Sequence, residues 1–341
     1  MLCDMTILVT GASGFIGSFI ISEGLRLGYE MWAGMRASSS KKYLQDERVR
    51  FAELDLADYE VLCGQLRTLK AQMGGFDYVV HAAGATKCIK ADDFYKTNTE
   101  GTKNLVNALS AEGMVPKRFV FISSLSVFGA IRETPFPYSP ILLTDTPQPN
   151  TAYGKSKLLA EQFLQKKTDL PWVILRPTGV YGPRERDYFL MAKSIKQHTD
   201  FAVGYRPQDI TFIYVRDLVD AVFLSLKAEG VEGKAYFLSD GKVYNSRRFS
   251  DLLQQELGNP WVLRIKAPIW ATRLICAVSG TVSGWFGKTS TLNRDKFYIL
   301  SQRNWQCDIE PACRDLGYEP KWPLERGVKE AVAWYKDNGW L

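Results

Sequence analysis

Short apolar runs rich in β-branched residues alternate with longer stretches of helical apolar spacing over the first half of the chain. The short runs predict β-strands, at residues 6–10, 29–36, 49–54, 76–81, 118–122 and 172–176. The longer stretches predict α-helices, at residues 18–27, from 58 onward, 91–112 and 151–165. Strands that alternate with helices in this way indicate an α/β protein with a doubly wound parallel sheet.

The pattern loosens after residue 179. Further elements are still expected, as helices at 187–198 and 216–228 and as strands at 211–215 and 235–238. We expect both strands to return to the sheet. The remainder, 245–341, is predicted to be mainly helical, and it ends in an amphipathic stretch at 324–338.

A glycine-rich turn joins the first strand to the first helix, as Gly11-x-x-Gly14-x-x-Gly17. Glycines at this spacing let the chain turn tightly and let a diphosphate approach the backbone, while the helix N-terminus attracts the phosphates. The residues expected to bind a dinucleotide here are Gly11, Ser13, Gly14, Phe15, Ile16 and Gly17. We therefore predict a Rossmann-type domain at 1–178, completed by 211–239, and a smaller, mainly helical substrate-binding lobe at 179–210 and 240–341.

The end of the second strand bears on the choice of cofactor. Folds that prefer NAD usually place an acid there to bind the ribose 2′-hydroxyl, but no carboxylate occurs between this strand and Asp46. Arg36, with Ser38 and Lys41, could instead hold a 2′-phosphate, because an arginine fork suits phosphate. This favours NADP(H); an Arg36 that only meets solvent would leave NAD(H) as the alternative.

Other positions along the chain suit the rest of a flat dinucleotide. Asp55 and Leu56 follow the third strand, where a carboxylate could meet an adenine amino group. The fourth strand ends in the small residues Ala82, Ala83 and Gly84, which leave room for a cofactor. Asn98 could anchor a lysine of the site through water, or it could be an ordinary capping or core residue.

Tyr153 and Lys157 lie four positions apart in a predicted helix, a spacing that puts both side chains on one face. A neighbouring ammonium favours the phenolate, so the tyrosine could exchange a proton with a carbonyl or alcohol oxygen at neutral pH. Such pairs are common on surface helices, so the pair alone means little. Ser124, just past the fifth strand, could donate to the same substrate oxygen.

Composition excludes several other classes of protein. The net charge is +6, and the whole excess lies in 261–306, so a broad nucleic-acid-binding face is not expected. Six scattered cysteines without a C-x-x-C motif and only two histidines make a metal site improbable. The start of the chain lacks the pattern of a signal peptide, so we expect a cytoplasmic protein.

Taken together, these motifs resemble those of the extended short-chain dehydrogenase/reductase family over nearly the whole chain. The matching motifs also include Ser123-Ser124, Leu175-Arg176-Pro177, Val180-Tyr181-Gly182-Pro183 and Tyr214-Val215-x-Asp217. The resemblance implies that Tyr153 is the proton donor or acceptor, that Lys157 lowers its pKa and holds the nicotinamide ribose, and that Ser124 orients the substrate oxygen. It also implies cofactor contacts from Asn98, Ser123 and Pro177, and a homodimer.

Departures from the family pattern limit which branch of the family the chain resembles. Leu125-Ser126 stand where sugar-nucleotide dehydratases carry an Asp-Glu pair, so dehydration is disfavoured. Gly179 stands where epimerases typically carry an asparagine that touches the substrate diphosphate, although Lys87 and Arg184 could still bind phosphate. The surrounding sequence is similar to the 3β-hydroxysteroid dehydrogenase and dihydroflavonol-reductase branches. Expected substrate contacts are Thr86, Lys87, Ser124, Gly179, Val180 and Arg184.

The segment at 261–286 mixes tryptophan and aliphatic residues with isolated Arg and Lys. Its composition suits a helix in a membrane interface, a lid over a greasy substrate, or plain core. We therefore expect an NAD(P)-dependent oxidoreductase for a lipophilic ketone or alcohol, sterol-like or a long-chain 3-keto lipid, with peripheral membrane contact through 261–306 at the inner face of the cytoplasmic membrane. The alternatives are a nucleotide-sugar 4-epimerase and a non-catalytic cofactor sensor.

Overall fold

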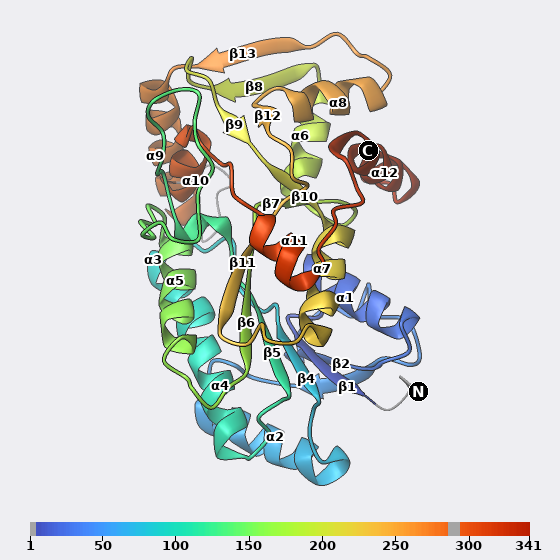
Figure 1. Cartoon of the computed structure of the whole chain (residues 1–341). Helices are drawn as coiled ribbons and strands as arrows, with labels where there is room; N and C mark the ends of the chain where they lie inside the picture. Colours follow the sequence, from blue (N-terminus) through green and yellow to red (C-terminus); the bar gives the residue numbers. More distant parts are fainter. Residues whose placement is uncertain (1–4, 286–293) are drawn as a thin grey trace.

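A seven-stranded parallel sheet forms the centre of the protein in a computed structural model that describes residues 5–285 and 294–341, without the side chains of 278–285 (Figure 1). The strand order is β11-β6-β5-β4-β1-β2-β3. The strands are β1 (Thr6–Thr10), β2 (Glu30–Met35), β3 (Arg50–Glu53), β4 (Tyr78–His81), β5 (Arg118–Ile122), β6 (Trp172–Pro177) and β11 (Lys234–Leu238). The predicted doubly wound parallel sheet is confirmed.

Helices cover both faces of the sheet, because alternate residues of each buried strand point to opposite sides. Ile7 and Val9 pack on the side of α1 (Phe15–Arg26) and α7 (Val215–Lys227), whereas Leu8 packs on the other side. The helices on that other side are α2 (Tyr59–Met73), α4 (Gly101–Ala111) and α5 (Ala152–Leu164). The predicted helix at 91–112 is present in three parts, namely α3 (Ala91–Phe94), a π-helical segment (Tyr95–Glu100) and α4.

The C-terminal half builds a lobe beyond the carboxyl ends of the sheet strands (Figure 1). Its helices are α6 (Asp187–Lys196), α8 (Arg248–Glu256), α9 (Ile269–Trp285), α10 (Arg294–Ser301) and α12 (Leu324–Asp337). By contrast, α11 (Glu310–Leu316) packs against β11 and α7 beside the sheet. Three two-stranded ribbons, whose pairing the sequence pattern does not predict, join distant segments. They pair β7 (Gly179–Tyr181) with β10 (Phe212–Tyr214), β8 (Thr199–Val203) with β13 (Leu263–Ala267), and β9 (Asp209–Ile210) with β12 (Tyr244–Asn245).

Two expectations about this half need correction. The strand expected at 211–215 does not return to the sheet, because β10 pairs in parallel with β7, whereas β11 does join the sheet beside β6. The segment at 261–286 is not one helix, because β13 occupies Leu263–Ala267 before α9 begins at Ile269. Phe286 and Lys288 lie outside the described residues. No helix in the described part of the chain is long and apolar enough to cross a membrane.

Candidate active site

A cavity of about 1210 Å³ lies at the carboxyl ends of the strands, between the sheet and the lobe. It runs from the glycine-rich turn after β1, past Ser124 and Tyr153, to apolar residues of the lobe. The carboxyl edge of a parallel sheet is the usual place for a ligand in this kind of fold. The expected cavity residues are therefore brought together from β1, β4, β5, β6 and α5.

The glycine-rich turn is shaped by packing that only glycine permits. Gly11 has a φ of 71°, and a Cβ there would lie 2.7 Å from Ala83 Cα. A Cβ at Gly17 would overlap the Gly11 carbonyl oxygen. The N-terminus of α1 at Gly14 has no side-chain cap, so its free N–H groups suit an anionic ligand. Gly11, Ser13, Gly14, Phe15, Ile16 and Gly17 all line the cavity, an arrangement that fits a dinucleotide diphosphate.

The adenosine side of the cavity matches the expectations only in part. Arg36, Asp55 and Leu56 line the cavity, and Arg36 is exposed. Ser38 and Lys41 do not line it; the Lys41 ammonium lies 4.0 Å from the centroid of the Phe51 ring. Ser39 lines the cavity instead, in a turn in which its N–H donates to the Arg36 carbonyl.

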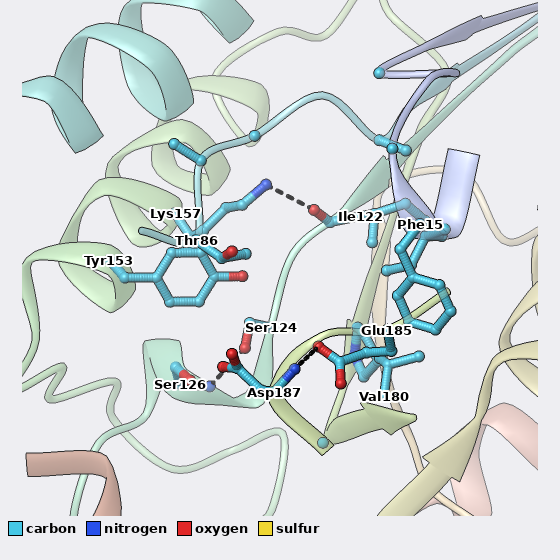
Figure 2. Close-up of a pocket in the computed structure, with 18 of the residues that line it drawn as sticks. Phe15, Thr86, Ile122, Ser124, Ser126, Tyr153, Lys157, Val180, Glu185 and Asp187 are labelled. Atoms are coloured by element: carbon cyan, nitrogen blue, oxygen red, sulfur yellow. Dashed lines mark hydrogen bonds between the residues drawn. The ribbon is translucent and has the colours of Figure 1, made fainter. Parts of the chain in front are cut away.

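Tyr153 and Ser124 meet because α5 approaches the loop after β5 closely. The Thr151 hydroxyl caps α5 by accepting a hydrogen bond from the Gly154 N–H at 2.9 Å. A Cβ at Gly154 would overlap the Ser126 carbonyl oxygen, so this contact needs glycine. Figure 2 shows that the Tyr153 phenol and the Ser124 side chain lie at the same part of the cavity, with Thr86 nearby. A half-buried phenol beside a serine hydroxyl is suited to proton transfer to a substrate oxygen.

Burial controls the protonation of the two expected catalytic groups. It raises the pKa of Tyr153 to about 12, although a hydrogen bond with Ser124 opposes the shift. It lowers the pKa of Lys157 to about 8, opposed by the Glu161 carboxylate. The Lys157 ammonium donates to the Ile122 carbonyl oxygen at 2.9 Å and lies 4.6 Å from the Phe121 ring centroid (Figure 2). Burial is therefore the largest cause of the Tyr153 shift, and the expected lowering of this pKa by Lys157 stays a prediction.

A buried ion pair lies directly beneath the site. Glu161 and Arg176 pair at 2.7 Å, with their side chains 0% and 7% exposed. Ser123, expected to contact the cofactor, lines the cavity but donates its hydroxyl to Glu161 at 2.5 Å. Pro177, at the end of β6, also lines the cavity as expected. The ion pair therefore fixes α5 against β6 and holds Ser123 in place.

Asn98 lies behind the cavity rather than in its wall. It is fully buried, and its amide donates to the Ala85 carbonyl and to Ser156 while accepting from the Ala85 N–H. Asn98 therefore supports the segment after β4, and its contact with the cofactor stays a prediction. That segment does line the cavity through Ala82, Ala83 and Gly84, and a Cβ at Gly84 would lie 3.0 Å from the Lys157 ammonium.

The expected substrate contacts divide into two groups. Thr86, Gly179 and Val180 line the cavity, together with Ser124. Lys87 and Arg184 do not line it. Lys87 pairs with Asp187, and Arg184 donates to the Ser18 hydroxyl at 2.8 Å and lies over the Phe19 and Tyr43 rings. Both cations have protein partners in this structure, and their contact with the substrate stays a prediction.

Several cavity residues were not predicted. The apolar residues at the lobe end of the cavity come from five separate segments and lie alongside polar ones such as Gln208, Ser246 and Lys296; they are Met191, Phe201, Ile210, Phe212, Phe249 and Leu300. Tyr188 lies beside Gly179, and Glu185 accepts hydrogen bonds from the Asp187 and Tyr188 N–H groups. Asp295 of α10 accepts from the Tyr153 N–H at 3.2 Å. Of these residues, only Glu185 could have been suspected from the local sequence, because an acid just before a predicted helix commonly accepts hydrogen bonds from its first N–H groups.

A cavity that joins an uncapped helix N-terminus to a tyrosine phenol is typical of enzymes that use a nicotinamide dinucleotide. Residues 7–239 match the model of the NAD dependent epimerase/dehydratase family. The chain belongs to this family and is an extended short-chain dehydrogenase/reductase, and thus an NAD(P)-dependent enzyme. Among the described residues, no group of three His, Cys, Asp or Glu is placed to hold a metal ion.

Relatives in this family act on different kinds of substrate. The chain is 26% identical over 353 residues to the 3 beta-hydroxysteroid dehydrogenase/Delta 5-->4-isomerase of Mycobacterium tuberculosis strain H37Rv, covering 96% of this chain and 90% of the relative. It is 28% identical over 342 residues to the 2-alkyl-3-oxoalkanoate reductase of Stenotrophomonas maltophilia, covering 96% and 99%. The solved UDP-glucose 4-epimerase of Thermotoga maritima has the same fold, with a TM-score of 0.77 at 23% identity, covering 98% and 99%.

Proposed function

We propose that the protein transfers hydride between a nicotinamide cofactor and a lipophilic ketone or alcohol, sterol-like or a long-chain 3-keto lipid. The observation that carries this proposal is the apolar end of the cavity beyond Ser124 and Tyr153. Apolar surface of this kind binds hydrocarbon by the hydrophobic effect. We assign cofactor binding to 1–178 and 215–239, and substrate binding to 179–214 and 240–341. β10 is placed with the substrate lobe because it pairs with β7.

The protonation state of Tyr153 suits the reduction of a ketone. A pKa near 12 keeps the phenol protonated at neutral pH, so Tyr153 can donate a proton to the oxygen that becomes an alkoxide. Ser124 lies beside it and can donate a hydrogen bond to the same oxygen, where negative charge develops. When bound, the nicotinamide supplies or accepts the hydride.

The reductase proposal is tested by turnover of a long-chain 3-oxoacyl ester with NADPH, followed by the loss of NADPH absorbance. Tyr153→Phe should abolish turnover while cofactor binding, measured by fluorescence titration, stays intact. Retained activity would refute Tyr153 as the acid. Lys155→Met, an exposed change on the same helix, is the matched control and should keep wild-type activity.

We further propose a preference for NADP(H), supported by the exposed Arg36 at the edge of the cavity. A 2′-phosphate there would pair with the guanidinium, whereas an acid would repel it. Arg36→Asp should weaken NADPH relative to NADH by about tenfold or more. Equal loss of both cofactors, or no change, would count against the preference. Arg50→Asp, at an exposed position on the neighbouring strand, is the control.

A nucleotide-sugar 4-epimerase is the second candidate, because the solved UDP-glucose 4-epimerase shares the fold over 98% of this chain. The wall around Gly179 argues against it. Glu185 and Tyr188 line this wall, neither Lys87 nor Arg184 reaches the cavity, and Lys296, which does line it, pairs with Asp187. Conversion of a UDP-hexose by the purified enzyme, without added cofactor, would favour the epimerase.

We also propose contact with an anionic membrane surface through the outer face of α9. Trp270 and Leu274 are 72% and 60% exposed, one helical turn apart, with the exposed Arg273 between them. Leu263 on the adjoining β13 is 56% exposed, and Phe201 on β8, in the wall of the cavity, is 59% exposed. Apolar side chains beside a cation suit an interface rich in anionic head groups. A lipid substrate could then enter the cavity near Phe201.

Vesicle sedimentation tests this contact. The protein should sediment with vesicles that contain phosphatidylglycerol, and less with pure phosphatidylcholine, because Arg273 adds electrostatic attraction. Trp270→Ser with Leu274→Ser should remove binding, whereas Val61→Ser, which changes an exposed residue of α2, should not. Unchanged sedimentation of the double variant would refute α9 as the contact. A cytoplasmic location and a homodimer through the helices that bear Asn98 and Tyr153 remain proposals; light scattering tests the dimer.

A further inference from the structure

Tyr188 places an unpaired hydroxyl at the wall of the cavity. A Cβ at Gly179 would overlap the Tyr188 hydroxyl oxygen, and both residues line the cavity. Across the described ranges, 5–285 and 294–341, this hydroxyl has no hydrogen-bond partner in the protein. A polar group in such a wall loses water when an apolar ligand fills the cavity, and this costs free energy unless the ligand supplies a partner.

The Tyr188 ring is held rigidly. Its centroid lies 4.6 Å from that of Phe249, 6.0 Å from that of Phe212 and 6.1 Å from that of Tyr181. Its backbone N–H donates to the Glu185 carboxylate at 2.7 Å, which fixes the first turn of α6. The hydroxyl is therefore a preorganised hydrogen-bonding group, so a ligand that binds it does not have to order the side chain first.

Strand register places this hydroxyl near the reacting centre. Ile122 of β5 pairs with Leu175 of β6, so Ser124 is level with Pro177, and Gly179 lies two residues farther along. With strands about 4.8 Å apart and a rise of about 3.3 Å per residue, the backbones of Ser124 and Gly179 lie on the order of 8 Å apart, and the Tyr188 hydroxyl lies beside Gly179. A substrate oxygen bound by Ser124 and Tyr153 would then have room for a second oxygen, a few bonds away, at Tyr188.

We propose that Tyr188 determines substrate specificity by hydrogen bonding to a second oxygen of the substrate, a few bonds from the reacting carbonyl. The proposal rests on the function proposed above and narrows it to a β-oxygenated ketone, such as a 3-oxoacyl ester or amide. The same phenol, with Gly179, fills space that a side chain at position 179 would need to reach a substrate diphosphate. Tyr188 thus selects for one class of ligand and against another.

The test compares two ketones of equal chain length, a long-chain 3-oxoacyl ester and a long-chain methyl ketone that lacks the second oxygen. The wild-type enzyme should prefer the ester by about tenfold in kcat/KM, the value of one hydrogen bond in a dry site. Tyr188→Phe should remove most of this preference by lowering kcat/KM for the ester, mainly through KM, while the methyl ketone is unaffected.

Tyr181→Phe is the matched control, because the Tyr181 hydroxyl is also buried and unpaired but lies outside the cavity wall. It should leave the preference unchanged. Equal loss for both ketones in Tyr188→Phe, or no loss for either, would overturn the role of the hydroxyl. If the wild-type enzyme reduces both ketones equally, the second-oxygen proposal is wrong but the reductase proposal stands. If it reduces neither, the proposed function fails and this inference fails with it.

Discussion

Replacement of Lys157 by methionine should stabilise the protein while it removes activity. Lys157 is only 4% exposed, and burial lowers its pKa from 10.5 to about 8. Each pKa unit corresponds to 1.36 kcal/mol, so keeping this ammonium charged in the fold costs about 3 kcal/mol at neutral pH. Methionine has a similar length and no charge. It loses the hydrogen bond to the Ile122 carbonyl, worth about 1 kcal/mol, so the net gain should be about 2 kcal/mol.

The pH dependence of the free energy of unfolding provides a second, independent test of this prediction. The folded pKa lies below the unfolded pKa, so the unfolded chain binds the Lys157 proton more tightly. The free-energy cost of burying the charged Lys157 side chain is fully present below about pH 8, declines as the pH rises from about 8 to 10.5, and is absent above that range. The advantage of Lys157→Met should therefore shrink by more than half between about pH 7 and about pH 10.

Urea unfolding of the cofactor-free protein at these two pH values measures both effects. Lys155→Met serves as the control, because Lys155 is exposed on the same helix and its replacement should change the free energy of unfolding by less than about 0.5 kcal/mol. A destabilised Lys157→Met variant at neutral pH would refute the reasoning. So would an advantage that does not change with pH.

Three further predictions concern the support of the site. Glu161→Ala should lower the free energy of unfolding by about 3–5 kcal/mol, because it leaves Arg176 buried without its partner; chemical denaturation measures this, and a loss below about 1 kcal/mol would contradict it. Gly154→Ala should lower the free energy of unfolding by about 1–3 kcal/mol and remove most of the activity, because the new Cβ overlaps the Ser126 carbonyl oxygen. Gly64→Ala in α2, where there is open space, is the control and should be neutral or stabilising. Equal effects of the two changes on unfolding would refute the packing argument. Ser124→Ala should shift the pH profile of alcohol oxidation to higher pH, because the Ser124 hydrogen bond lowers the pKa of Tyr153. Ser126→Ala is the control and should leave the profile in place. An unchanged profile in Ser124→Ala would show that this hydrogen bond does not lower the Tyr153 pKa.

The sequence predicts best those parts of the molecule whose signals are local. The strand, turn and helix around Gly14 and the Tyr153–Lys157 spacing each occupy a short stretch, and the structure brings them to one cavity. The parallel sheet follows from the alternation of elements. Apolar periodicity in the first 178 residues therefore locates the sheet strands to within a few residues.

Features that depend on distant segments could not be predicted in this way. β8 and β13 are separated by 59 residues between their ends, so the pairing that interrupts the expected helix at 261–286 has no local signal. Arg184 was assigned to the substrate because it follows a family motif, but its position is set by Ser18 on α1. The pKa of Tyr153 depends on how completely the lobe excludes water, which the spacing of two side chains cannot indicate.

The two sides of the cavity are encoded very differently along the chain. Ser124, Tyr153 and Lys157 come from one contiguous stretch of fewer than forty residues, whereas the apolar end is assembled from five separated pieces of the lobe. Mutations can therefore remodel those pieces one at a time without touching the proton-transfer groups. Such an arrangement favours divergence, in which a lineage inherits its reaction unchanged and acquires new substrates through small, independent steps.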